Sequence, residues 1–261
     1  MSHLSFRAFL ASTCLALSLA ATHAAAEPVT EADFLPFDPK QAELGQLLFY
    51  DPILSGNRNI SCGTCHHHDH HGGDGLSLGI GEGGTGVGKE RLPGAGETKV
   101  RKRVPRNAPS LFNLGAREVR VLFHDGRLSV SDLYENGFNS PAEEFLPDGL
   151  DSILAAQALF PMVSETEMAG NPGENEIAGA TKDRIDKPWP IVAERVRAIP
   201  GYPPLFIDGF EDIEAPIDIE IQHIVNALAA FINSEWRSFD SRFDRSLIGE
   251  ITLTEAESRG R

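Results

Sequence analysis

The chain has 261 residues, 41% of them hydrophobic, and a formal net charge of -15 at pH 7. This length suits one large domain, or one domain with part of a second. The excess of acidic residues disfavours nucleic acid and anionic membrane surfaces as partners, because both carry negative charge. It is compatible with a small redox protein that presents a positive face, although solubility alone would also explain it.

Residues 1–26 have the pattern of a secretory signal peptide. Arg7 is followed by an apolar stretch from Ala8 to Ala21, and small residues then lead to Glu27. The apolar stretch is too short and too broken for a stable membrane span, and no other stretch approaches spanning length. We therefore expect cleavage of the signal, export to the periplasm and no membrane span in the mature protein.

The first expected helix covers residues 41–49. Leu44, Leu47 and Leu48 are spaced to fall on one face of this helix. A proline at position 52 ends the pattern, because proline cannot continue a helix. A turn rich in asparagine, glycine and serine then leads to the next feature.

The pentapeptide at residues 62–66, Cys-Gly-Thr-Cys-His, is the most informative feature of the sequence. In this C-x-x-C-H pattern, two thiols on one turn can each bond a vinyl group of the same porphyrin, and the adjacent imidazole can ligate the iron. A chance match, a zinc half-site and a thiol redox pair are the alternatives, but zinc needs further ligands and a redox pair needs no histidine. Cys14 lies in the signal, so the mature chain keeps only Cys62 and Cys65. We expect one covalent haem c with His66 as its iron ligand.

Residues 72–96 are rich in glycine, which occupies 11 of these 25 positions. The segment 81–86 matches G-x-G-x-x-G, but a nucleotide site needs a strand before that motif and a helix after it. Neither is expected here, so we interpret the match as accidental. A glycine-rich loop lets the backbone pass close to a flat ligand, which suits the edge of a haem better than a phosphate.

A basic run follows the glycine-rich loop. Its cations serve either as solvated surface or as partners for haem propionates and acidic redox proteins, and the sequence favours neither use. Arg106 is the one cation that we expect to point inward. The run consists of Lys99, Arg101, Lys102, Arg103 and Arg106.

A helix is expected over residues 150–160. Asp151 or Ser152 is placed to cap its N-terminus. Gln157 shares the apolar face of this helix, because residues at 100° intervals place it beside Ile153. A glutamine in this position is either a satisfied core amide, which is the commoner case, or a group aimed into a pocket.

Residues 216–232 show the clearest helical pattern, with Pro216 suited to the first turn. One apolar stripe runs from Ile217 to Ile232. His223 falls on the opposite face, which we expect to meet solvent, so we reject it as a haem ligand. No strand-like alternation of any length is present. The fold class expected is mainly α, a cytochrome-c-like helical haem domain with long glycine-rich loops.

Several segments together resemble the bacterial dihaem cytochrome c peroxidase family, which includes the MauG-type oxidases. The resemblance extends over nearly the whole mature chain, with the segments in the right order. It implies a periplasmic enzyme that reduces hydrogen peroxide with electrons from a small cytochrome c or a cupredoxin. The segments are LGQLLFYDPILSGNRNISCGTCH (44–66), PRNAPSLFNLG (105–115), FHDGR (123–127), LAAQALFPMVSETEM (154–168) and FDRSLIGE (243–250).

The resemblance also implies a domain organisation and roles for single residues. Residues 27–215 correspond to the peroxidatic haem domain, and residues 216–261 to a helical lead-in to a second cytochrome c domain. Glu167 matches the distal acid–base residue, which moves a proton from the inner oxygen of peroxide to the leaving one. Without the family pattern, Glu167 reads as a surface or helix-terminal acid.

Three further positions match family residues. Gln157 and Pro161 correspond to residues on the distal side of the peroxidatic haem, and Gln157 joins Glu167 as a candidate catalytic residue. Asn107 corresponds to an asparagine that helps to hold a calcium ion between the two domains. Calcium is therefore a second candidate cofactor.

The sequence departs from the family pattern in four ways. Glu82 stands sixteen residues after His66, where the family often has a distal histidine, so we expect an open or water-occupied distal site. His124 replaces a tryptophan that lies between the haems, and residues 129–153 are additional. The stretch 253–261 resembles the lead-in to a second C-x-x-C-H motif, which this sequence does not contain.

The single motif leaves three interpretations. The leading one is the peroxidatic half of a dihaem peroxidase, with inefficient turnover unless a partner chain or a dimer supplies the second haem. The alternative is a monohaem electron-transfer protein without catalysis, in which Met162 or Met168 closes the iron as its sixth ligand. The third is an inert remnant that never receives haem.

Residues 67–71 contain four further histidines around Asp69. Together with Asp74 they could bind zinc, copper or nickel ions. Adjacent histidines on an exposed loop more often form a solvated and weakly chelating patch, and we expect that here.

Overall fold

The computed structural model describes residues 26–96 and 101–260. It divides into two compact units, Val29–Ser241 and a smaller one that includes α8 (Arg242–Leu247) and α9 (Glu255–Arg259). The C-x-x-C-H motif lies in the larger unit. The signal peptide expected at the N-terminus lies outside the described residues, apart from its last position.

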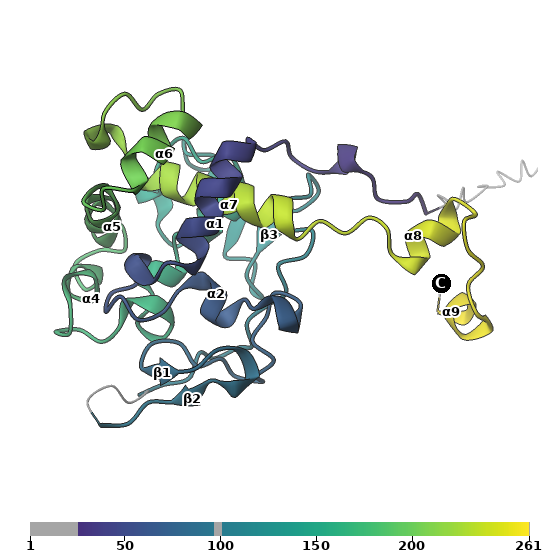
Figure 1. Cartoon of the computed structure of the whole chain (residues 1–261), viewed down its shortest axis with the longest axis horizontal. Coiled ribbons are helices and arrows are strands. Elements are labelled where there is room, and N and C mark those ends of the chain that lie inside the picture. Colours follow the sequence, from purple (N-terminus) through teal and green to yellow (C-terminus); the bar gives the residue numbers. More distant parts are fainter. Residues whose placement is uncertain (1–25, 97–100, 261) are drawn as a thin grey trace, which may run out of the picture. The chain divides into compact units, whose positions relative to one another are not determined.

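Helix α1 (Pro39–Tyr50) packs along α7 (Ile221–Glu235) at the centre of the larger unit (Figure 1). The Asp38 side chain caps α1 by accepting two backbone N–H groups of its first turn. Gly45 lies at the crossing, where a Cβ would overlap the carbonyl oxygen of Ala227. The absence of a side chain at Gly45 therefore allows the two helices to approach this closely.

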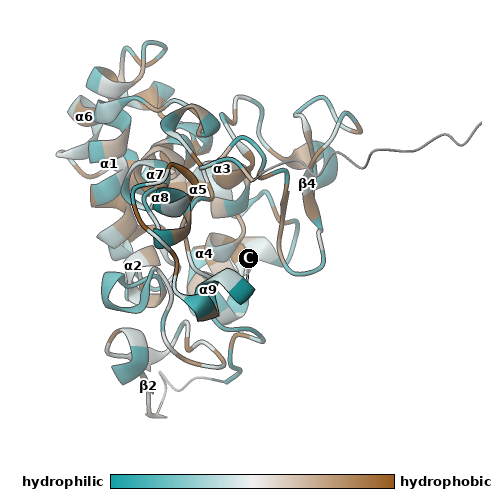
Figure 2. Ribbon diagram, turned by 90° about the vertical axis from the view of Figure 1, so that its right-hand side faces the viewer, coloured by the Kyte–Doolittle hydropathy of each residue, from teal (hydrophilic) through white to brown (hydrophobic). Residues whose placement is uncertain are grey.

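Further helices cover this central pair. α3 (Ile153–Ala158) and α5 (Pro188–Arg197) contact α7, and α6 (Tyr202–Gly209) contacts α1. α4 (Glu176–Thr181) packs on α5. Figure 2 shows hydrophobic segments at α3 and α7 in the interior of this unit. The helices thus bury one continuous apolar core around α7.

The strands are short and lie at the edge of the helical core. β1 (Gly84–Thr85) and β2 (Leu92–Pro93) form one antiparallel pair, and β3 (Val121–Leu122), β4 (Leu128–Val130) and β5 (Phe138–Asn139) form an antiparallel sheet in that order. With 43% helix and 7% strand, the expected mainly α fold is confirmed. The paired residues include Gly84 with Pro93, Val121 with Ser129 and Ser129 with Asn139.

The apolar face expected for α1 is only partly correct. Leu44 and Leu48 are buried, but Leu47 is 52% exposed. The contact with α7 is centred on Gly45, and at 100° per residue Leu47 projects to nearly the opposite side of the helix. The expected cap of α3 is present, because Ser152 accepts the backbone N–H of Ala155.

The helix expected from residue 216 begins later, at Ile221. Pro216–Asp218 form a separate 3-10 turn, and Ile217 is 71% exposed rather than part of the apolar stripe. The chain is extended at Ile219 and Glu220 between the two elements. A break of this kind is invisible to a periodicity argument, because the apolar residues continue through it.

The expectation that His223 meets solvent is wrong. The residue is buried, and its Nδ1 accepts the backbone N–H of Glu220 at 2.9 Å. Its Nε2 lies 3.1 Å from Oδ2 of Asp212, and the ring packs edge-on against Phe210. The segment from Phe210 to Asp212 covers this face of α7, which no feature of the helix sequence reveals. Both ring nitrogens are engaged within the fold.

The larger unit includes α7 and ends at Ser241, beyond the domain boundary expected at residue 215. The division into a haem domain and a lead-in remains a prediction. In the smaller unit, Arg242 pairs with Glu257 at 2.8 Å and Thr254 caps α9. None of the described helices is long and apolar enough to span a membrane.

Replacing Gly45 by alanine should destabilise the larger unit. The new Cβ would displace α7 at Ala227, and we expect a loss of about 1–3 kcal/mol in the free energy of unfolding, as for other overpacked cores. Urea denaturation monitored by circular dichroism measures it. Gly179→Ala on α4 is the matched control, because nothing lies within 4 Å of its Cβ position. That change should stabilise by up to about 1 kcal/mol, and equal effects of the two substitutions would contradict the prediction.

Candidate haem site and its polar surroundings

The two motif cysteines lie on α2 (Cys62–Cys65), a single helical turn. Both are free thiols, half-buried and packed against the apolar core. Burial raises the pKa of Cys62 to about 12 and that of Cys65 to about 11. A thiol redox pair needs a lowered pKa, because the thiolate is the reactive form. The site therefore holds two neighbouring protonated thiols, which argues against the redox-pair alternative.

His66 follows directly and has a defined orientation. Its Nδ1 lies 2.7 Å from the carbonyl oxygen of Gly72 and donates a hydrogen bond to it in the neutral tautomer. Burial lowers the pKa of the imidazole, which favours that neutral form. With the proton on Nδ1, the Nε2 lone pair is available to a metal, and the backbone bond sets the plane of the ring.

The glycine-rich loop is held together from inside by Arg91. This side chain is buried and donates to the carbonyl oxygens of Ile80, Gly81 and Gly86. The loop then reaches the segment after α3, because a Cβ on Gly81 would overlap the Thr166 carbonyl oxygen. A cavity of about 480 Å³ lies beside this loop, lined by Asn59, Thr64, Arg91 and residues 83–87. The G-x-G-x-x-G match thus belongs to a loop without the flanking strand and helix of a nucleotide site.

Glu167 lies on a one-turn π-helix, Glu165–Ala169. Such turns are rare and often occur at functional sites. Burial raises the pKa of the half-buried carboxyl, while a hydrogen bond from Ser164 and the positive charge of Arg127 act in the opposite direction. The charge of Glu167 also adds to the effect of burial on the pKa of the Cys65 thiol. The fold therefore places the acid within electrostatic range of the motif.

The other residues expected on the distal side lie on the elements just before Glu167. Gln157 is half-buried on α3, and Pro161 begins the 3-10 turn Pro161–Val163. Met162 and Met168 are buried in the apolar core.

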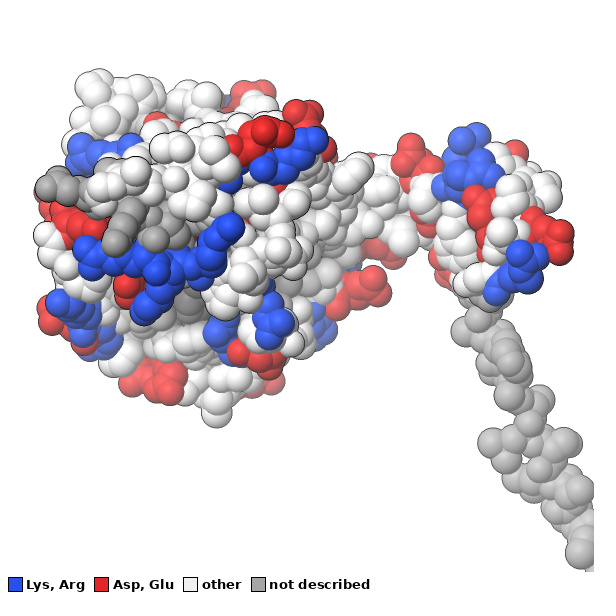
Figure 3. Space-filling view, turned by 90° about the horizontal axis from the view of Figure 1, so that it is seen from below, with Lys and Arg blue, Asp and Glu red and all other residues white. Residues whose placement is uncertain are grey.

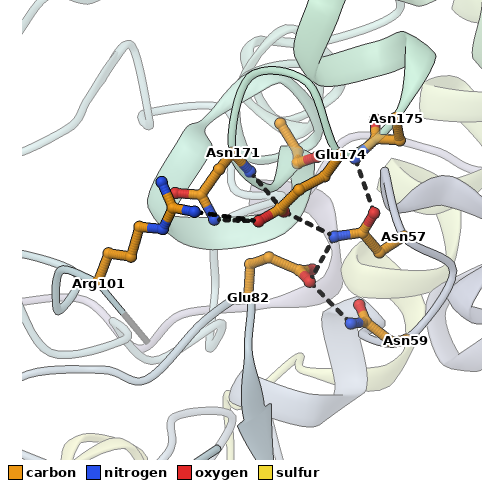
Figure 4. A network of polar contacts seen from close by, with 8 residues as sticks. Asn57, Asn59, Glu82, Arg101, Asn171, Glu174 and Asn175 are labelled. Atoms are coloured by element: carbon orange, nitrogen blue, oxygen red, sulfur yellow. Dashed lines mark hydrogen bonds and ion pairs between the residues drawn. The ribbon is translucent and has the colours of Figure 1, made fainter. Parts of the chain in front are cut away.

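Glu82 lies at the centre of a polar network that connects three segments (Figure 4). Its Oε1 accepts from the side-chain amides of Asn57 at 2.9 Å and Asn59 at 2.7 Å. Asn57 also donates to Glu174 at 3.1 Å and accepts from Asn175. These bonds connect the glycine-rich loop to the turn that follows Glu167, and they direct Glu82 towards the asparagines.

The basic run lies on the surface of the larger unit, where Figure 3 shows lysine and arginine side chains gathered on one face. Arg106, which we expected to point inward, is exposed, as are Arg101, Lys102 and Arg103; Lys99 lies outside the described residues. Asn107 is exposed too. Among the described residues, no group of three or more His, Cys, Asp or Glu side chains is arranged to hold a metal ion.

The histidines after the motif have separate contacts. His68 Nε2 lies 2.6 Å from the Tyr50 hydroxyl, and His67 Nδ1 lies 3.6 Å from Asp69. The ring of His70 packs on Gly88 of the glycine-rich loop. His67, His68 and His70 therefore each have a different partner within the fold.

Two arginines of the site were not predicted from the sequence. Arg91 stands alone between glycine-rich stretches, and its burial depends on three carbonyl groups that only the folded loop brings together. Arg127 belongs to the FHDGR segment and stacks on Phe123 at 4.4 Å. The sequence alone assigns Arg127 no role within this segment, and only the fold shows that its charge acts on Glu167.

The helical fold, the free thiol pair and the oriented imidazole define a protein of the c-type haem class. A profile of the di-haem cytochrome c peroxidase family matches residues 39–252, so the chain belongs to this family, as its resemblance implied. It is 27% identical over 224 residues to the methylamine utilization protein MauG of Methylorubrum extorquens, over 86% of this chain and 46% of that protein. It is 25% identical to the cytochrome c551 peroxidase of Pseudomonas aeruginosa over 233 residues, which cover 89% of this chain and 49% of that protein.

Solved structures agree with this assignment. A MauG-like protein associated with microbial copper homeostasis is similar over 94% of this chain and 54% of its own, with 27% identity and a TM-score of 0.54. The dihaem peroxidase BthA of Burkholderia thailandensis is similar in fold, with 21% identity, a TM-score of 0.50 and coverage of 87% and 46%. The chain spans about half the length of the curated relatives it matches.

Replacing Arg91 by lysine should loosen the glycine-rich loop, although the charge is kept. Lysine cannot bridge three carbonyl groups with a planar fork, so we expect a loss of about 1–3 kcal/mol in unfolding free energy. Hydrogen exchange at residues 80–86 should accelerate as well. Arg103→Lys is the control, because this exposed residue donates to one carbonyl, that of Leu78. Unchanged exchange in the Arg91 variant would contradict the role given to it.

Proposed function

We propose that the chain binds one haem c through thioether bonds to Cys62 and Cys65, with Nε2 of His66 on the iron. The hydrogen bond from Nδ1 of His66 to Gly72 carries this proposal, because it leaves Nε2 available and fixes the ring. The two free thiols on one turn fit the same group. When bound, the haem supplies the iron at which peroxide is reduced. The single motif within residues 1–261 provides one such site.

We further propose that this site reduces hydrogen peroxide to water, with two electrons and two protons consumed per molecule. Glu167 would accept a proton from one peroxide oxygen and return it to the other, which becomes water. Its raised pKa supports this role, because a general acid–base works best when its pKa is near the working pH. Gln157, on the preceding helix, would orient the peroxide.

The electrons would come from a small cytochrome c or a cupredoxin, because these are the donors that the family resemblance implies. One relative is named for methylamine utilization and another as a cytochrome c551 peroxidase. Of these two roles, we propose the peroxidase role for this chain. Because the family is dihaem and residues 1–261 hold one motif, we propose that a second redox group takes part in efficient turnover. Calcium at Asn107, export to the periplasm and cleavage after residue 26 belong to the same proposal.

Glu167→Gln should slow the reaction with peroxide by about 10²–10⁴-fold and leave the haem in place. In the parent protein the rate should rise with pH through the raised pKa of Glu167, because the base must be deprotonated to accept the proton. The variant should lose this dependence. Stopped-flow absorbance of the haem measures both. Glu165→Gln, an exposed acid on the same π-helix, should behave like the parent, and an equal loss there would remove the role from Glu167.

The visible spectrum separates this proposal from the electron-transfer alternative. We expect a high-spin ferric haem that reacts with peroxide, and Met162→Leu and Met168→Leu should leave the spectrum unchanged, because both side chains belong to the core. A low-spin spectrum that is insensitive to peroxide and changes with either substitution would instead show methionine ligation. In that case the chain would be an electron carrier.

A further inference from the structure

Aromatic side chains form a continuous group close to His66. Phe231 packs edge to face against both Phe49 and Trp236, and the rings of Phe49 and Trp236 are tilted by 43°, with all centroids 5.2–5.4 Å apart. Tyr50 and His68 extend this group to the surface. The peroxide chemistry proposed for Glu167 uses none of these residues.

Trp236 is the inner member of the group. Trp236 is 3% exposed, and its Nε1 lies against Gly72. A Cβ added to Gly72 would lie 3.2 Å from this nitrogen. Gly72 is the residue whose carbonyl accepts the hydrogen bond from His66. One hydrogen bond and one van der Waals contact thus connect the imidazole of the proposed iron ligand to the indole.

Tyr50 is the outer member. Its hydroxyl lies 2.6 Å from Nε2 of His68, and the His68 ring lies 5.0 Å from that of Trp236. Tyr50 is 42% exposed, so its ring reaches solvent. It is also held firmly, because a Cβ on Gly63 of the motif would overlap the tyrosine ring. The carboxylate of Glu235 lies 3.9 Å from His68 Nε2.

We propose that Tyr50 and Trp236 form a path by which single electrons enter the haem site from the surface. Indole and phenol are the side chains that give up one electron most readily, and here they lie in order from the iron ligand to solvent. This proposal rests on the proposed function, which supplies the oxidant, a haem oxidised by peroxide.

The steps balance in electrons and protons. Trp236 gives one electron to the oxidised site, and Tyr50 then gives one electron to Trp236. The phenol proton passes to solvent, which the exposed ring of Tyr50 reaches, and a neutral tyrosyl radical remains. A one-electron donor at the surface reduces the radical, and the phenol takes up a proton from solvent.

Electron paramagnetic resonance of the haem-loaded protein, frozen rapidly after mixing with hydrogen peroxide, tests the path. Ring-deuterated tyrosine or tryptophan identifies the residue type. We expect a tyrosyl radical in the parent protein, loss of that signal with a tryptophan radical remaining in Tyr50→Phe, and loss of both in Trp236→Phe. Ferrocyanide added before freezing should remove the tyrosyl signal. A signal that survives ferrocyanide, or a tyrosyl radical that persists in Trp236→Phe, would overturn the proposal.

The chain offers matched controls, because it has three tyrosines and two tryptophans. Tyr202 and Trp189 are buried residues outside this group. Tyr202 donates to Asp51, and Trp189 donates to the Leu159 carbonyl oxygen. Tyr202→Phe and Trp189→Phe should leave the signals intact. An unchanged haem spectrum in every variant shows that the fold is kept. Radicals that disappear in these controls would contradict the assignment.

A second oxidant separates this proposal from the peroxidase proposal. Photo-oxidation of the haem-loaded protein with a ruthenium tris-bipyridine complex and persulfate needs no reaction with peroxide. This oxidant takes an electron from the exposed Tyr50 directly, so the path predicts a tyrosyl radical that is lost in Tyr50→Phe and kept in Trp236→Phe. If peroxide fails in all variants but photo-oxidation gives this pattern, Tyr50 is supported as the surface end of the path and the peroxidase proposal fails. If the parent reacts with peroxide but the radicals formed do not depend on Tyr50 and Trp236, the path alone is wrong.

Discussion

The close contact between α1 and α7 determines where the aromatic residues beside the C-x-x-C-H motif lie. Gly45 permits this contact, because the backbone of α7 at Ala227 occupies the place of a side chain. At its C-terminal end α1 places Tyr50 against α2, and α7 is capped at its C-terminus by Trp236, which lies against Gly72. A helix pair that crossed further apart would separate these rings from the haem motif, so one absent side chain affects both packing and the surroundings of His66.

A second constraint comes from the backbone of the glycine-rich loop. Few side chains are available there to form a core, so the buried guanidinium of Arg91 organises the loop through carbonyl groups. The loop then contacts the π-helix at Thr166, and the amide network around Glu82 ties it to the following turn. The position of Glu167 therefore depends on residues distant in the sequence, which explains how an acid in a short irregular turn can have a defined environment.

Burial acts on the ionisable groups of the site in a consistent direction. It raises the pKa of Cys62, Cys65 and Glu167 and lowers that of His66, so each group is shifted towards its neutral form. Protonated thiols suit thioether formation with a porphyrin better than dithiol redox cycling, and a neutral imidazole suits iron. A carboxyl whose pKa is raised accepts a proton more readily than an ordinary glutamate does.

Local chemistry determined the parts of this protein that the sequence predicts by itself. The C-x-x-C-H spacing, the cap of α3 at Ser152 and the mainly helical fold depend on residues within a turn or two of one another. Tertiary structure alone decided which faces are covered: it buried His223, exposed Leu47, and placed Arg91, Arg127 and Trp236 around the site. Periodicity defines the faces of a helix but not its neighbours, because the neighbours come from segments whose distance along the chain carries no periodic signal.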